Sequence, residues 1–362
     1  MIRPESEAEL SAAIAQAAGP LRIVGGGTRP VGRATGQVLS TAGLSGISLY
    51  EPGALTIVAG AGTPLAEVEA ALAAENQRLP FEPMLAGALL GVEGNSTIGG
   101  VVAANASGPR RIQAGACRDS LIGVRFVDGR GDIIKNGGRV MKNVTGYDLV
   151  KLLAGSWGTL GVLSEVAFKV LPGVEAVVTL EVSGVDDVAA IGAMSAALGS
   201  PYEVSGAAYD PGGQVVMLRL EGFSDSLTYR TEKLQAVLAS FGDVSVNPDA
   251  DWIAVRDASA FAGGSGDLWR ISVKPSDGPR VGAALEGAKL LYDWGGGLIW
   301  AEVVQGFDLR GALGGIAGHA TLMRGTGCGP VFHPEPTPLA AISAGLRAQF
   351  DPRGILNNGL MG

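Results

Sequence analysis

Short apolar runs alternate along the chain with segments whose apolar residues recur every three or four positions. The short runs are typical of buried strands, and the longer spacing is typical of helices with one buried face. The first half of the chain therefore mixes strands and helices. The predicted strands cover residues 21–24, 55–59, 122–127 and 162–170, and the predicted helices cover residues 6–18, 64–76 and 148–154.

Helix 64–76 has the clearest start signal, because Thr63 precedes Pro64. A threonine hydroxyl can accept a hydrogen bond from a free backbone N–H, and a proline at the first helical position loses no donor that the helix needs. We therefore expect the Thr63 side chain to cap this helix.

The pattern changes near Pro172 and Gly173, where glycine-rich loops give way to longer strand and helix patterns. Such alternation suits an antiparallel sheet covered by helices on one face, so we place a domain boundary near residue 172. The predicted strands here cover residues 175–182, 214–222, 268–274 and 298–304, and the predicted helices cover residues 186–198, 226–240, 279–290, 308–323 and 338–349.

Charge and cysteine content narrow the classes of partner and compartment. The net charge is −8 with no block of lysine or arginine, which argues against a nucleic-acid partner. Cys117 and Cys328 form neither a disulfide framework nor a zinc-binding spacing. The N-terminal segment is acidic where a signal peptide would be basic, and the apolar stretch 85–92 is far shorter than the roughly 20 residues of a membrane span. We expect a cytoplasmic protein that meets membranes only through partner subunits.

Glycine is the compositional anomaly, with 57 of 362 residues clustered between apolar runs. In LRIVGGGTRP (21–30), three glycines follow a predicted strand directly. Glycines let successive backbone N–H groups converge on one anion, above all a phosphate, although a simple tight turn is the alternative. The P-loop pattern is absent, and GAGTPL (60–65) carries Leu65 where the dinucleotide-binding fingerprint has its third glycine.

Two further glycine segments, GNSTIGGVVAANASGP (94–109) and AGSWGTLGV (154–162), add short polar side chains able to hydrogen bond in a crowded site. Asn357 and Asn358 lie near the C-terminus. Several glycine-lined walls suit a long, flat, phosphate-bearing ligand.

Five ordered motifs then resemble the FAD-binding fold of the vanillyl-alcohol oxidase superfamily, also called the PCMH type: GGGT, TIGG, NASG, KNVTGYDLVKLLAGSWGTLGV and FDPRGILNNG. The combination of KNVTGYD, LWRISV, WGGGLIW and AGHATLMRG resembles the family of E subunits of bacterial glycolate oxidases. The resemblance implies an α+β protein with a two-subdomain FAD-binding domain at residues 1–172. It also implies an α+β cap domain with an antiparallel sheet at 173–337, and a C-terminal segment, 338–362, that returns to the FAD domain.

The resemblance also implies which residues bind the cofactor. The first glycine loop would wrap the FAD pyrophosphate, the TIGG segment would pass along it, and the NASG turn would approach the flavin. The tail motif of such proteins usually reads Asn-Pro-Gly-Lys, whereas this chain reads NNGL. The implied residues are Gly25, Gly26, Gly27, Thr28, Arg29, Thr97, Ile98, Gly99, Gly100, Asn105, Ser107, Gly108, Val162 and Asn357.

The attachment of FAD follows from the first glycine loop. Some members of the superfamily tether the flavin through a histidine in this loop, and none is present here, so the resemblance implies noncovalent FAD. A flavin bond to Cys117 is the alternative. We favour a buried spectator thiol at Cys117.

By resemblance, the chain is one FAD-binding subunit of a complex that oxidises glycolate to glyoxylate. A larger FAD-containing subunit would carry the hydroxy-acid site, and an iron–sulfur subunit would accept electrons. Related flavoprotein dehydrogenases use paired histidines for a base and a metal, but His319, in a predicted helix, and His333, in a proline-rich loop, form no such pair. We therefore predict no metal site and name no catalytic residue. We expect each histidine to have a structural role, and the alternatives are a role in catalysis or at a subunit interface.

Two other functions stay open from the sequence. One is a stand-alone FAD-dependent oxidoreductase that acts on another hydroxy compound. The other is a structural subunit whose flavin cleft is empty.

A few further side chains invite a functional interpretation. Arg110 and Arg111 could face phosphate or solvent, and we predict the surface. Tyr147 and Asp148 could touch the cofactor, but a position at a helix N-terminus explains Asp148 without a functional role. The second half holds four tryptophans, of which we expect three in the core: Trp252, Trp269, Trp294 and Trp300.

Overall fold

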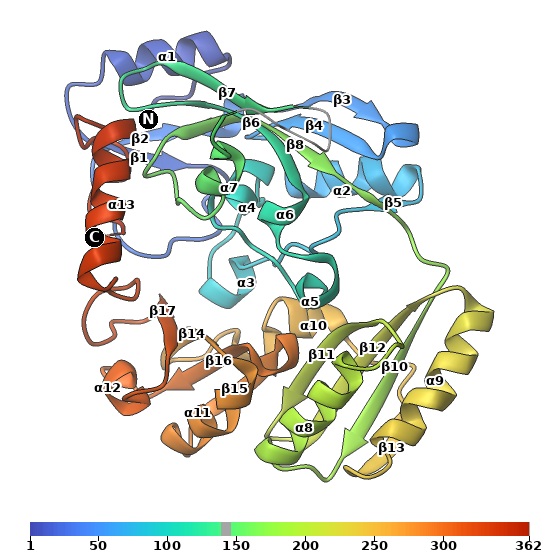
Figure 1. Cartoon of the computed structure of the whole chain (residues 1–362). Coiled ribbons are helices and arrows are strands. Elements are labelled where there is room, and N and C mark those ends of the chain that lie inside the picture. Colours follow the sequence, from blue (N-terminus) through green and yellow to red (C-terminus); the bar gives the residue numbers. More distant parts are fainter. Residues whose placement is uncertain (139–145, 362) are drawn as a thin grey trace.

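A computed structural model of the chain describes residues 1–138 and 146–361, and it contains two antiparallel sheets (Figure 1). The first half forms a five-stranded sheet, and the second half forms an eight-stranded sheet below it in the view of Figure 1. The predicted α+β class is confirmed. The motif KNVTGYD lies mostly outside the described residues.

The five-stranded sheet packs its apolar face against short helices in one core. Two further strand pairs flank it: a parallel pair of β1 (Leu21–Val24) and β2 (Gln37–Ser40), and β5 (Gln77–Arg78) with β9 (Leu171–Pro172). In sheet order the five strands are β3 (Ile47–Glu51), β4 (Thr56–Gly60), β8 (Val162–Lys169), β6 (Leu121–Val127) and β7 (Ile133–Gly137). The helices are α1 (Glu7–Ala15), α2 (Leu65–Ala74), α3 (Gly87–Leu90), α4 (Ile98–Ala103), α5 (Arg111–Ala114), α6 (Cys117–Ser120) and α7 (Leu149–Leu153).

The eight-stranded sheet consists of two four-stranded halves, which the register joins at one residue pair, Tyr209 and Tyr292. In sheet order its strands are β13 (Asp243–Val246), β10 (Ala176–Ser183), β12 (Val215–Gly222), β11 (Val204–Asp210), β15 (Lys289–Asp293), β16 (Leu298–Val303), β14 (Asp267–Val273) and β17 (Gly318–Arg324). The remaining helices are α8 (Asp187–Leu198), α9 (Ser224–Leu238), α10 (Trp252–Arg256), α11 (Gly278–Ala284), α12 (Leu309–Leu313) and α13 (Thr337–Phe350).

Each strand of this sheet alternates its side chains between two environments, as a period of two requires. In β14, Trp269 and Ile271 point into a core formed with α8, α9 and α11, which lie on the side turned away from the five-stranded sheet (Figure 1). Leu268 belongs to a different cluster on the opposite face, which includes residues of the first half of the chain. The second face is therefore the one that meets the glycine-rich loops.

The C-terminal segment packs against the first half of the chain (Figure 1). The ring of Phe350, at the end of α13, lies 6.1 Å from that of Phe126 in β6. The tail then pairs with β1: Leu21 donates its N–H to Ile355 O at 2.7 Å and accepts from Asn357 N at 3.0 Å. The tail thus lies beside the first glycine loop.

The structure confirms most of the predicted elements and overturns two helices of the second half. The helix predicted at 279–290 ends at Ala284, and residues 289–293 form β15 instead. The helix predicted at 308–323 is wrong after Leu313, because residues 318–324 form β17 at the edge of the sheet. Glycines at 311, 314, 315 and 318 disfavour a helix there. Ala320 and Leu322, two residues apart, face the core as strand residues do.

The predicted cap of helix 64–76 is also wrong. The helix begins at Leu65 with Pro64 as its N-cap, and no side chain caps it. The Thr63 hydroxyl instead donates to Gly60 O at 2.7 Å and accepts from the Gly46 N–H at 2.9 Å. This side chain ties two loops of the first sheet together.

A buried network of ion pairs joins the two halves of the chain. Glu82, from the first half, accepts two hydrogen bonds of 2.8 Å from Arg219 of β12. Glu221, also of β12, accepts bonds of 2.9 and 2.8 Å from Arg110 and one of 2.9 Å from Arg78. The Arg110 side chain is 9% exposed, so the prediction that it lies at the surface is wrong. Bidentate arginine–carboxylate pairs fix orientation as well as distance, so they help to fix the relative position of the two sheets.

We expect the substitution Glu221→Gln to destabilise the fold strongly. It leaves Arg110 and Arg78 without their shared carboxylate, and removing one partner of a buried pair costs about 3–5 kcal/mol. Thermal unfolding at neutral pH measures the loss. Glu232→Gln, at an exposed position on α9, is the matched control and should leave the midpoint within a degree or two, the range of a surface change of ~0.5 kcal/mol.

The same carboxylate predicts an acid-dependent loss of stability. Burial acts to raise the pKa of Glu221, but its hydrogen bonds to Arg110 and the charges of Arg110, Arg219 and Arg78 outweigh burial and lower it from 4.5 to about 2. Its contribution is therefore full above pH 4.5 and is lost as the pH falls toward 2. The gap in midpoint between the wild type and Glu221→Gln should narrow over that range. A gap that stays constant down to pH 2 would contradict this account.

Candidate functional site

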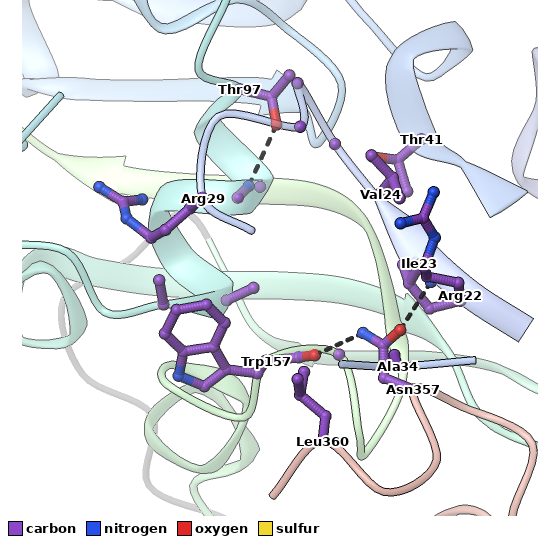
Figure 2. Close-up of a pocket in the computed structure, with 18 of the residues that line it drawn as sticks. Arg22, Ile23, Val24, Arg29, Ala34, Thr41, Thr97, Trp157, Asn357 and Leu360 are labelled. Atoms are coloured by element: carbon purple, nitrogen blue, oxygen red, sulfur yellow. Dashed lines mark hydrogen bonds between the residues drawn. The ribbon is translucent and has the colours of Figure 1, made fainter. Parts of the chain in front are cut away.

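A cavity of about 530 Å³ opens beside β1, where the first glycine loop leaves the strand (Figure 2). Its walls come from the loop after β1, the start of α4, the segment before β8 and the C-terminal tail. Ten of the residues implied by the resemblance line it: Gly25, Gly26, Gly27, Thr28, Arg29, Thr97, Gly99, Gly100, Val162 and Asn357. Segments far apart in the sequence therefore converge on one cavity.

The glycines of these walls allow the loops to pack directly on one another. A Cβ on Gly26 would lie 1.6 Å from the Asn95 carbonyl oxygen, and one on Gly25 would lie 2.4 Å from the Thr97 hydroxyl oxygen. A Cβ on Gly99 would lie 2.6 Å from Ala61. Side chains at these positions would push the three segments apart and distort the cavity between them.

The first loop also presents backbone donors without protein acceptors. Within the described part of the chain, the N–H groups of residues 26–29 make no hydrogen bond to protein. Those of Ile98 and Gly99, by contrast, donate to Thr63 O at 2.9 Å and Ala61 O at 2.8 Å. The free donors of this cavity therefore come from the GGGT loop, while the amides of Ile98 and Gly99 serve to hold α4 in place.

The charge of this cavity is entirely positive. Arg22, Arg29 and Arg33 line it, and no Asp or Glu is among its lining residues in the described part of the chain. In a chain of net charge −8, such a bias marks a site for an anion. Free backbone N–H groups together with arginines are the donor set that phosphates prefer.

Asn357 lines the cavity, and both polar atoms of its side-chain amide are hydrogen-bonded to protein (Figure 2). Its Oδ1 accepts from the Ile23 N–H at 2.8 Å, and its Nδ2 donates to Trp157 O at 2.8 Å. Both contacts join the tail to the cavity walls. Asn357 therefore fixes the position of Trp157, which lines the cavity as well.

The other four implied residues lie elsewhere. Ile98 is fully buried in the core of the first sheet and lines neither this cavity nor the one next to it. Asn105, Ser107 and Gly108 line the neighbouring cavity. The side chains of Asn105 and Ser107 accept hydrogen bonds from the backbone N–H groups of Arg118 and Cys117 at 3.0 and 2.9 Å, so both shape the NASG turn.

The neighbouring cavity has a volume of about 730 Å³ and lies between the two sheets. It shares Arg29, Ala104, Ser156 and Trp157 with the first cavity, so the two are adjoining chambers. Its far wall is the second face of the eight-stranded sheet. Alternate residues of three neighbouring strands form that wall: Arg270 and Ser272 of β14, Leu298 and Trp300 of β16, and His319, Thr321 and Met323 of β17.

Both histidines line this second chamber, although the sequence placed His319 on a helix. His319 lies on β17, and burial, followed by the charges of Arg270, His333 and Arg111, lowers its pKa. Burial, followed by the charge of Arg310, lowers the pKa of His333, and its Nδ1 accepts from the Ala320 N–H at 3.4 Å. Both imidazoles are therefore neutral at neutral pH.

Two other titratable groups are perturbed by burial near these chambers. Burial raises the pKa of the Cys117 thiol well above its ordinary range. Cys117 is fully buried in the first core and lines neither chamber, so the predicted burial of this thiol is confirmed. Burial raises the pKa of Asp293, at the second chamber, to about 7.

The remaining predictions have mixed outcomes. Arg111 is partly buried and lines the second chamber, so the prediction of a surface position is wrong. All four tryptophans are buried, one more than expected. Asp148 caps α7 by accepting from the Lys151 N–H at 3.1 Å, as predicted, and Tyr147 is 88% exposed and lines neither chamber.

Sequence reasoning missed the arginines that give the chambers their charge. Arg22 and Arg33 flank the first glycine loop, and a search for cations near that loop could have found them. Arg270 lies in the predicted strand 268–274, whose alternation places it opposite Trp269, but only the structure shows which face lines the chamber.

Residues 1–138 and 146–361 contain neither a candidate membrane span nor a candidate metal site. No helix there is both long and apolar enough to cross a membrane. No group of three or more His, Cys, Asp or Glu side chains is placed to hold a metal ion.

Comparison with known proteins identifies the family of the chain. Residues 1–137 match the family model described as FAD binding domain. The chain is 37% identical over 339 residues to the glycolate oxidase subunit GlcE of Escherichia coli, a match that covers 92% of this chain and 88% of that protein. GlcD, a glycolate oxidase subunit of Bacillus subtilis, is 46% identical over 85 residues, which are 24% of this chain and 18% of that protein.

More distant relatives agree on the fold. The D-lactate dehydrogenase of Archaeoglobus fulgidus is 32% identical over 179 residues, which cover 48% of this chain and 38% of that protein. A solved structure of alkyldihydroxyacetonephosphate synthase superposes with a TM-score of 0.72 at 15% identity, covering 99% of this chain and 76% of that one. The chain therefore belongs to the family of FAD-dependent oxidoreductases that includes the glycolate oxidase subunit GlcE.

Proposed function

We propose that the first cavity holds FAD through backbone donors of the GGGT loop, and that the chain serves a glycolate oxidase complex as one of its flavin-binding subunits. The observation that carries the proposal is the donor set: four consecutive free N–H groups beside three arginines, with no facing carboxylate among the described lining residues. A diphosphate satisfies such donors and neutralises such charge.

In this proposal residues 1–172 and 338–362 form the cofactor-binding part, and residues 173–337 form the cap. Gly26, Gly27 and Thr28 donate their N–H groups to the pyrophosphate, and Arg29 adds charge where the two chambers meet. Asn105, Ser107 and Gly108 form the wall of the second chamber. Bound FAD supplies a flavin that accepts a hydride from the substrate.

We propose that the FAD is held without a covalent bond. The first glycine loop carries no histidine, and the Cys117 thiol lies in the core of the first sheet. Denaturing the purified protein should release all of its flavin into the filtrate. Flavin fluorescence that migrates with the polypeptide on a denaturing gel would refute this.

The role within a complex is proposed from the likeness to GlcE over nearly the whole chain. We propose a larger FAD-containing subunit and an iron–sulfur subunit as partners, with glycolate oxidised to glyoxylate and the electrons passed to the iron–sulfur subunit. The protein would be cytoplasmic and would reach a membrane only through these partners.

Purification of the tagged chain from its native cells tests this role. We expect a second flavoprotein and an iron–sulfur protein to co-purify in fixed ratio, with glycolate-dependent dye reduction by the assembly. Full activity of the chain alone on glycolate or D-lactate would instead show a stand-alone enzyme. A colourless chain with no absorption near the ~450 nm flavin band would show a structural subunit.

The substitution Gly26→Ala tests the cavity assignment. Its Cβ would meet the Asn95 carbonyl oxygen at 1.6 Å, so the GGGT loop and the 94–97 segment must separate and the donors lose their convergence. We expect loss of most bound FAD, measured as the flavin-to-protein absorbance ratio. The clash is with protein backbone rather than with the ligand, so a lower unfolding midpoint should accompany the loss.

Gly19→Ala is the matched control, because nothing lies within 4 Å of a Cβ at Gly19 and its φ is not positive. It should retain FAD at the wild-type ratio. Retention of FAD by Gly26→Ala at the wild-type ratio would contradict the assignment.

A further inference from the structure

Two arginines of the second chamber share one aromatic ring. The guanidinium carbon of Arg111, in α5, lies 4.2 Å from the ring centroid of Trp294, and that of Arg270, in β14, lies 5.1 Å from the same centroid. One arginine comes from each half of the chain. Two positive charges are therefore neighbours at the boundary between the halves.

Neither charge has a carboxylate partner within the described residues. No ion pair and no hydrogen bond from the guanidinium of Arg111 or Arg270 to protein occurs there, whereas Arg110, next along the chain, is paired twice. Buried charges are normally paired, and neighbouring like charges repel each other. The two arginines therefore leave room for an anion that would neutralise their charge.

Burial and repulsion both act on this pair. Burial, followed by the charges of Arg111 and Arg29, lowers the pKa of Arg270 to about 10 against the attraction of Asp293. Arg270 stays protonated at neutral pH all the same. Asp293, whose pKa burial raises to about 7, is only partly ionised there and so offsets only part of the charge of the two arginines.

Two hydrogen bonds position Trp294, whose ring both arginines contact. Its indole Nε1–H donates to Gly108 O at 3.0 Å across the boundary between the halves, and its backbone N–H donates to the Asp293 carboxylate at 2.7 Å. Its φ of +54° is a conformation that side chains of this size rarely adopt. Such strain persists where the surrounding structure fixes a residue, as it does at many functional sites.

We infer that Arg111 and Arg270 form a binding site for a small carboxylate anion in the second chamber. The inference rests on the proposed function, since it adds to the proposed cofactor site a place where this chain itself holds a 2-hydroxy or 2-oxo acid. A planar guanidinium binds a carboxylate through two parallel hydrogen bonds. The other lining groups suit a small organic acid, because Leu298, Trp300 and Met323 offer apolar walls beside the charges.

Position favours a substrate anion over a cofactor phosphate. Neither Arg111 nor Arg270 lines the first cavity, where the free backbone donors and the other arginines lie. The two chambers adjoin through Arg29 and Trp157. An acid held by Arg111 and Arg270 would lie in the chamber next to the cofactor.

Calorimetric titration of the full chain with glycolate tests the site, with the neutral isostere glycolamide as the comparison. We expect saturable binding of glycolate and none of glycolamide, because the site recognises charge. Arg270→Gln and Arg111→Gln should each weaken glycolate binding at least about tenfold, the loss of ~1.4 kcal/mol that one charge-assisted pair represents. The two substituted residues lie on different elements, so one variant still tests the site if the other fails to fold.

Arg280→Gln is the matched control, since Arg280 is an exposed arginine of α11 that lines neither chamber. It should bind glycolate within twofold of the wild type. The inference is overturned if wild type shows no saturable binding, if glycolamide binds equally well, or if Arg280→Gln weakens binding as much as Arg270→Gln does.

Bound flavin separates this inference from the proposed function. We expect Arg270→Gln to keep FAD at the wild-type ratio while it loses glycolate binding. Loss of FAD by this folded variant would show that the arginines serve the cofactor phosphate, and would overturn the inference. A wild-type chain that binds glycolate but no FAD would refute the proposed function and leave the carboxylate site standing.

Discussion

The structure depends on the buried ion pairs that join the eight-stranded sheet to the first half of the chain. Glu82 binds Arg219, and Glu221 binds Arg110 and Arg78, in geometries that fix both distance and angle. The hydrogen bond from Trp294 to Gly108 O and the apolar cluster of Leu268 also join the two halves. Loss of the ion pairs would weaken the attachment of the eight-stranded sheet to the first half of the chain, and with it the boundary at which the second chamber lies.

The glycine loops serve a purpose that follows from close packing. Gly25, Gly26 and Gly99 lie where a Cβ would strike the neighbouring segment, so glycine lets the three loops meet. The consequence is chemical as well as structural, because the GGGT loop then presents its free backbone N–H groups to the cavity. The cavity that we propose for the cofactor thus results from loops packed too tightly for side chains.

The two chambers differ in the groups that supply their positive charge. The first combines free backbone donors with arginines, which suits a diphosphate, and the second places two arginines on the ring of Trp294 beside apolar walls. Both concentrate positive charge in a chain whose net charge is −8. Focused positive potential in a cleft attracts small anions even when the protein as a whole repels them.

The sequence by itself determined the α+β class, most strands and helices, the glycine loops and their likeness to an FAD-binding fold, because these depend on residues close together along the chain. Only the tertiary structure decided the rest. It buried Arg110 against Glu221, placed His319 on an edge strand, and turned Arg270 toward the second chamber. Each of these outcomes depends on partners more than forty residues away, or on which face of a sheet the other half of the chain covers, and local periodicity shows neither.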